Sequence, residues 1–185
     1  MLFRASRSTF QFIGGWHITK TRPLLEKRAE NLCMMGDMGH PTSLAFQDLL
    51  SEASSLYRNV FLLAGRCEHG RDVGSVDTDA LLHDMCQKYS NVNFLQRSSV
   101  ALRPDLIVAG STLRCWPRDE RYAESFLPLL DELYIKEGNR EKKVLYLSYG
   151  MPKKRHLAFV EELPGAGLLV PVDVDTNPPE DPLCL

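Results

Sequence analysis

The sequence has no long hydrophobic run, few cysteines and little net charge, and each shortage excludes a class of protein. No apolar stretch in the 185 residues approaches the roughly 20 residues that a helix needs to cross a bilayer, so we predict no transmembrane helix. The formal net charge of −2 gives no basic surface for nucleic acid. We therefore expect neither a membrane nor a nucleic acid as partner.

The cysteines argue against a disulfide framework and against a zinc ribbon. Their number, five, is odd, and no two of them form a Cys-x-x-Cys pair. This usage fits a reducing compartment. The residues before Glu26 include four basic ones and no acid, a faint mark of a mitochondrial leader. A strand expected from about Phe10 leaves little room for one, so we predict a cytoplasmic protein with a short leader segment at residues 1–9.

Two short apolar runs, residues 32–35 and 60–64, each end at a glycine that polar residues follow. Gly36-Asp37 follows the first run, and the second leads through Gly65 into residues 66–69, Arg-Cys-Glu-His. Between them, residues 42–58 have apolar positions at helical spacing. This pattern predicts a βαβ unit, whose right-handed crossover brings both strand ends to one edge of the sheet. We therefore expect the two polar loops to converge on one crevice.

The rest of the chain predicts alternating helices and strands, which is typical of an α/β fold. A hydrophobic share of 44% is enough for one sizeable core, and we predict one domain over residues 10–174. Residues 175–185 are acidic and rich in proline, which predicts a disordered tail. The further predicted elements are helices at 77–89 and 124–136, with His83 on a helix surface, and strands at 91–95, 99–102, 106–109 and 144–149.

Five segments, taken in order, resemble the calcineurin-like metallophosphoesterases. The loops after Gly36 and Gly65 are similar to the family's Gly-Asp and Gly-Asn-His-Glu loops, and residues 10–17, 106–113 and 144–152 are similar to three of its strands with the loops that follow them. The resemblance implies an α/β fold in which a layered β-sheet sandwich is flanked by helices. The family has further strands after the last of these segments, so the resemblance implies that the C-terminal strands are missing here.

The family holds two cations, which polarise a phosphate and generate a hydroxide. The resemblance implies that His17 and Asp37 are remnant metal ligands. It also implies three losses, because Gly15 stands at the position of an Asp ligand, Arg66 at that of an Asn ligand, and Cys67 at that of the His that protonates the leaving group.

Later ligands are missing as well. Tyr149 and Gly150 replace two histidines, and no histidine follows His156 to form the family's last metal-binding motif. Arg66 adds to these losses, because a guanidinium has no lone pair to donate and repels a cation. We therefore predict a phosphoesterase-type protein with a degraded dinuclear site, non-catalytic or much weakened, and with no cofactor.

Three alternatives stay open. The first is an active metal-dependent hydrolase of phosphate esters, using Mn, Fe or Zn, in which Cys67, Glu68 and His69 are the catalytic residues. Its Cys67 thiolate would hold one soft cation together with His17 and Asp37, whereas the plainer interpretation of Cys67 is a partly buried thiol.

The second alternative is a phosphate-binding or protein-interaction module. Arg66 and the loop amides would hold an anion, unless Arg66 pairs with Asp37 or Glu68. A protein partner or a second copy would cover a sheet edge left exposed. The third alternative is an unrelated doubly wound domain. The resemblance requires parallel strands ending at Gly15, Gly36 and Gly65 to lie side by side.

Overall fold

The computed structural model describes residues 2–5, 8–18, 24–69, 75–112, 142–149 and 169–172. The chain divides into two compact units, with the boundary between Phe94 and Leu95, and each unit is described by itself. The predicted helix at 124–136, the tail at 175–185 and Gly150 lie outside the described residues. A single domain over residues 10–174 stays a prediction. None of the described helices has the length and apolarity needed to span a membrane.

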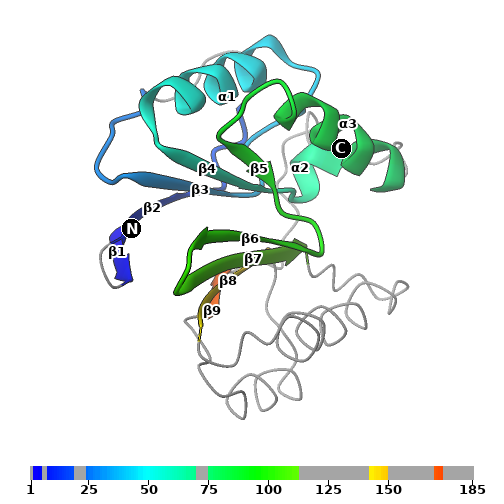
Figure 1. Ribbon diagram of the computed structural model, residues 1–185. Helices are drawn as coiled ribbons and strands as arrows, with labels where there is room; N and C mark the ends of the chain where they lie inside the picture. The colour runs from blue at the N-terminus through cyan, green and yellow to red at the C-terminus, as the bar shows by residue number, and fades with distance from the viewer. Residues whose placement is uncertain are drawn as a thin grey trace. The chain divides into compact units, whose positions relative to one another are not determined.

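The first unit is built on a five-stranded sheet that is parallel except at one edge (Figure 1). Its strand order, β1-β2-β3-β4-β5, follows the chain, and β1, which lies within the predicted leader, is the antiparallel strand. The elements are β1 (Leu2–Ala5), β2 (Ser8–Ile13), β3 (Asn31–Met35), α1 (Leu44–Leu56), β4 (Asn59–Leu63), α2 (Arg66–His69), α3 (Ser75–Cys86) and β5 (Val92–Phe94).

The predicted βαβ unit is confirmed as β3, α1 and β4. β3 and β4 pair in parallel, from Asn31 opposite Asn59 to Met35 opposite Leu63. Every residue of β3 is buried, as are all of β4 but the first, which explains why both strands are continuous apolar runs instead of alternating ones. Because the strand order shows no reversal, successive right-handed crossovers through α1 and α3 bring both helices to the same face of the sheet, where they share one core cluster.

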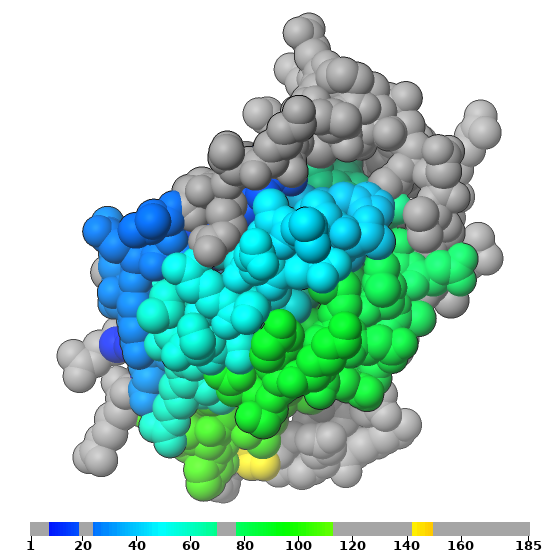
Figure 2. Space-filling model, turned by 90° about the horizontal axis from the view of Figure 1, so that it is seen from above, coloured from blue at the N-terminus to red at the C-terminus, as the bar shows by residue number. Residues whose placement is uncertain are grey.

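α1 begins where the sequence predicts a helix start. The side chain of Ser43 accepts a hydrogen bond from the Phe46 amide at 3.2 Å and caps the helix. Phe46, Leu49, Leu50 and Ala53 are buried against the sheet, whereas Leu44, which the spacing places on the apolar face, is 77% exposed. Leu44 is the first residue of the helix, where the helical spacing no longer decides which side a residue faces. The outer side of α1 lies at the surface in Figure 2, where this helix is cyan.

α3 confirms the predicted helix at 77–89, although it begins and ends earlier. Leu82, Met85 and Cys86 are buried in the core, and Leu81 is 39% exposed. The side chain of His83 is 61% exposed, which confirms its predicted place on the helix surface.

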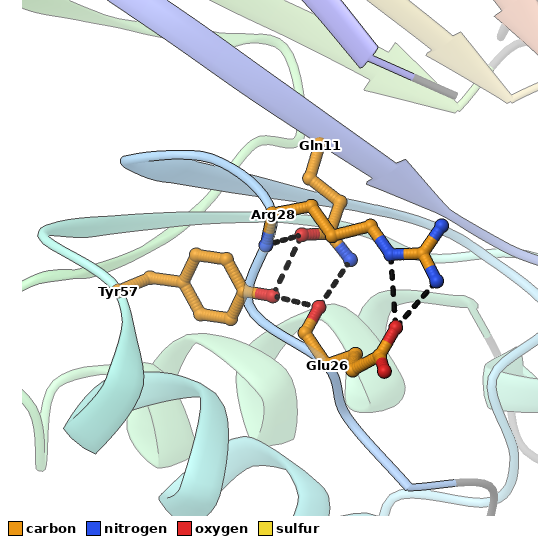
Figure 3. A network of polar contacts seen from close by, with 4 residues as sticks. All are labelled: Gln11, Glu26, Arg28 and Tyr57. Carbon is orange, nitrogen blue, oxygen red and sulfur yellow. Dashed lines mark hydrogen bonds and ion pairs between the residues drawn. The ribbon is translucent and has the colours of Figure 1, made fainter.

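A polar network fastens the segment before β3 to β2 and to the end of α1 (Figure 3). The Gln11 side chain accepts hydrogen bonds from the Arg28 amide at 2.8 Å and the Tyr57 hydroxyl at 2.9 Å, and it donates one to the Glu26 carbonyl at 3.0 Å. The Arg28 guanidinium also pairs with the Glu26 carboxylate at the surface. Gln11 is buried, so these bonds satisfy polar groups that water does not reach.

The second unit contains a four-stranded sheet with the order β6-β7-β8-β9. β6 pairs antiparallel with β7, and the other pairs are parallel. The strands predicted at 99–102, 106–109 and 144–149 are confirmed, and β9 adds a strand beyond the segments that carry the resemblance. The bounds are β6 (Ser98–Arg103), β7 (Leu106–Thr112), β8 (Lys143–Tyr149) and β9 (Leu169–Val172).

We expect Gln11→Leu to lower the free energy of unfolding by about 2–3 kcal/mol, because it leaves buried donors and acceptors without partners. Tyr57→Phe removes one hydroxyl of the same network and is expected to cost about 1 kcal/mol. Urea denaturation followed by circular dichroism measures both. The matched control is Tyr89→Phe, because no hydrogen bond of the Tyr89 hydroxyl occurs within the described part of the chain. Equal losses for both tyrosines would contradict the role of the network.

Candidate functional site

The loops that follow β2, β3 and β4 meet at one edge of the sheet. The Gly15 amide donates to the Gly36 carbonyl at 3.0 Å, and the His17 amide donates to the Asp37 carbonyl at 2.9 Å. A further parallel bridge joins Ile18 to Gly39. The prediction that the strands ending near Gly15, Gly36 and Gly65 lie side by side is confirmed by this pairing.

The backbone at this edge adopts left-handed conformations that L-residues rarely take. His17 has a φ of 46° and Asp37 a φ of 54°, next to Gly15 at 67° and Gly36 at 86°. A non-glycine residue in this region costs about 1–2 kcal/mol, so the surrounding contacts must hold it there. Strain of this kind concentrates at functional sites and ligand clamps.

His17, Asp37 and Cys67 come together at the edge, as the sequence predicts. The Nδ1 atom of His17 lies 3.0 Å from the Sγ atom of Cys67, although the two residues are 50 positions apart. The Cys67 amide donates to Oδ1 of Asp37 at 2.9 Å. Cys67 is 4% exposed and Asp37 is 7% exposed, so the contacts lie largely out of water.

Glu68 turns away from this cluster into the backbone of the two loops. Its Oε2 accepts from the amides of Asp37 at 2.9 Å and Gly65 at 2.7 Å. Its Oε1 accepts from the amides of Met38 at 2.6 Å and Gly39 at 3.4 Å. Sequence reasoning gives Glu68 a catalytic role or a pairing with Arg66 and misses this contact, because an acid in a loop carries no sign of which amides it will meet.

His69 also makes contacts inside the protein. Its Nδ1 lies 2.8 Å from the Gly65 carbonyl, and its Nε2 lies 3.0 Å from Oδ1 of Asp79 on α3. Both ring nitrogens face oxygen acceptors, and the residue is 1% exposed. Both nitrogens of the His69 ring are therefore engaged by groups inside the protein.

Arg66 is the first residue of α2 and is partly buried. A role for its guanidinium in anion binding stays a prediction.

Tyr149, at the position of a family histidine, ends β8 in the second unit and is 2% exposed. A phenol has no basic lone pair comparable to that of imidazole, so Tyr149 does not supply the ligand that the resemblance implies at this position.

The residues present do not fit the two-metal centre that the resemblance implies. A nitrogen and a sulfur on one tetrahedral zinc lie about 3.6 Å apart, given the usual Zn–N and Zn–S lengths. The 3.0 Å between Nδ1 of His17 and Sγ of Cys67 is instead a hydrogen-bond distance. Within the ranges that the structure describes, no group of three or more His, Cys, Asp or Glu side chains is arranged to hold a metal ion.

A separate cavity of about 480 Å³ opens beside β2. Polar and apolar groups line it in about equal parts, and its lining includes Phe12, Ile13, Trp16, Leu24 and the ion pair of Glu26 and Arg28. The sequence predicts none of these residues as functional. Neither Cys67 nor Glu68 lines the cavity.

No protein-family model matches the chain, and no curated protein matches its sequence. The resemblance to metallophosphoesterases therefore stays a prediction from the residues that carry it.

The Glu68 carboxyl should make stability depend on pH. Burial, and next the neighbouring Asp37 carboxylate, raise the pKa of Glu68 from 4.5 to about 7. Because the folded pKa is the higher one, the folded chain retains a proton that the unfolded chain releases between these two values. This contribution to stability is fully present below pH 4.5 and is lost as the pH rises through about 7.

We therefore expect urea midpoints, measured with a chelator present, to fall more steeply with rising pH for the wild type than for Glu68→Gln over about pH 5–8. A constant difference between the two proteins over this range would contradict the shifted pKa.

Proposed function

We propose that the chain is a phosphoesterase-type α/β protein whose two-metal site is degraded, and that it acts without hydrolysis as a binding or interaction module. The proposal includes the layered sandwich that the resemblance implies. It is carried by one observation, the contact of 3.0 Å between the His17 imidazole and the Cys67 thiol.

That contact supports the proposal because it engages an imidazole nitrogen of one remnant ligand, His17, with the thiol of Cys67. The other remnant ligand, Asp37, accepts a hydrogen bond from the Cys67 amide through one carboxylate oxygen. Loss of a single second-shell partner already costs about 10–100-fold in metal affinity or activity. Here Gly15, Arg66 and Cys67 replace residues that would bind the metal or act on the substrate directly, so the expected loss is larger.

The strand order supports the proposal against an unrelated doubly wound domain. Doubly wound sheets bind ligands where the strand order reverses, with helices on both faces. Among the described strands of the first unit, the order from β1 to β5 shows no reversal. The site instead forms where three successive loops run along one another, at the edge to which the resemblance assigns the metal centre.

The decisive experiment measures metal content and hydrolysis on the same preparation. We expect less than about 0.1 equivalent of Mn, Fe or Zn after dialysis, and no turnover of an aryl phosphodiester when these metals are added back. Mass spectrometry of the elements and release of the coloured phenol are the readouts. Two tightly held divalent ions with turnover would overturn the proposal, whereas one equivalent of zinc without turnover would favour the single-cation alternative.

A gain-of-function variant tests why the site is degraded. Gly15→Asp is sterically possible, because no described heavy atom lies within 4 Å of the added Cβ and Asp tolerates a φ of 67° better than most residues. Combined with Arg66→Asn and Cys67→His, it should bind Mn²⁺ at least about 10-fold more tightly than the wild type. Isothermal titration measures the affinity.

The matched control moves the new carboxylate by one residue. Gly14→Asp replaces Gly15→Asp in the same triple variant, and its Cβ would lie 3.3 Å from the Cβ of Met35 instead of in open space. We expect no comparable gain in affinity. An equal gain in both triple variants would show that any added acid is sufficient and would argue against the family geometry.

Anion binding is a second candidate. Arg66 lies beside the loops, but the amides of Asp37, Met38, Gly39 and Gly65 already donate to Glu68. Titration with a phenyl phosphate tests this candidate, because binding in the millimolar range that Arg66→Ala abolishes would support it. A protein partner or a second copy stays a proposal, and light scattering that shows a stable monomer would count against the second copy.

A further inference from the structure

Four backbone amides of two different loops converge on one side chain. The amides of Asp37, Met38 and Gly39 are consecutive in the loop after β3, and the fourth belongs to Gly65 after β4. Each oxygen of the Glu68 carboxylate accepts from two of them, at distances between 2.6 and 3.4 Å. The carboxylate is therefore bound as an anion ligand is bound, by converging N–H dipoles.

The loop backbone is built for this purpose. Gly36 and Asp37 have positive φ values of 86° and 54°, and Gly39 has one of 148°. Successive amides in such conformations form a concave nest that points their N–H groups at one position. Gly39 has no alternative, because a Cβ there would lie 2.7 Å from the Ile18 carbonyl oxygen.

The chemistry of the nest selects a carboxylate over a neutral amide. Glu68 is 1% exposed, so its oxygens have little water to replace the bonds to the four amides. A glutamine would turn one NH₂ group toward N–H donors and leave them unpaired, and buried unpaired donors destabilise a fold.

We infer that the amides of Asp37, Met38, Gly39 and Gly65 form a receptor for a small monocarboxylate, which Glu68 occupies as an internal ligand. By closing this receptor, Glu68 fixes the loop that bears Asp37 against the loop that bears Cys67. Glu68 is thus a positioning residue, and the receptor would take formate or acetate once its side chain is removed. This inference does not depend on the proposed function.

The test is chemical rescue of the full chain at about pH 8, where an added monocarboxylate is fully ionised. Glu68→Gly should lower the thermal midpoint by about 10 °C. Sodium formate at about 0.2 M should restore at least half of that loss, relative to sodium chloride of the same ionic strength. The wild type and the control Asp48→Ala, which removes an exposed carboxylate of α1, should show no difference between the two salts.

Formate that acts no better than chloride on Glu68→Gly, or equally well on the wild type, would overturn the inference. An unchanged midpoint in Glu68→Gly would do the same. Glu68→Gln is expected to be destabilised and not rescued, because its side chain still fills the space that formate needs.

If Glu68→Gly does not fold, hydrogen exchange of the wild type decides the question. The receptor amides lie outside helices and strands, yet we expect them to exchange at least about 100-fold more slowly than an exposed loop amide such as that of His40. Exchange of all four at the rate of His40 would overturn the inference.

Discussion

The structure at the sheet edge depends on how one buried carboxylate is satisfied. Glu68 joins the loop after β3 to the loop after β4 through four amides, and both loops contribute a residue to the cluster of His17, Asp37 and Cys67. The bond from the Asp37 amide to Glu68 acts together with the bonds that Asp37 accepts from the His17 and Cys67 amides, and these contacts hold Asp37 at a φ of 54°. The strained backbone of Asp37 and the contacts of Glu68 therefore form one arrangement. Favourable contacts between a carboxylate and backbone N–H dipoles hold a backbone conformation that is unfavourable by itself.

Much of the fold can be predicted from the sequence because its signals are local. The runs at 32–35 and 60–64 are buried on both faces, so their composition identifies β3 and β4, and Ser43 marks the start of α1. The exceptions are also local in cause. Leu44 is at a helix end, where spacing no longer fixes the side that a residue faces. β1 is short, and its four residues are too few for an alternation of apolar and polar side chains that would distinguish a strand from a leader.

The site could be predicted only in part, because its partners are distant in the sequence. Strand topology brings Asp37 near residues 66–69, and the convergence of the two loops follows from it. Which atoms then meet is decided by side-chain direction. Cys67 turns toward His17, whereas Glu68 and His69 turn into the backbone and toward α3. No spacing rule separates three neighbouring residues in this way.

Gly15 and Gly39 lie at the same edge of the sheet but differ in the side chains that could replace them. Gly39 has the Ile18 carbonyl oxygen 2.7 Å from where a Cβ would lie, whereas Gly15 has open space around that point. Natural variation and saturation mutagenesis should therefore treat them differently. Position 39 would be intolerant of every replacement, so variation there reports on folding. Position 15 would accept asparagine and aspartate, so selection for a new activity could act at this position.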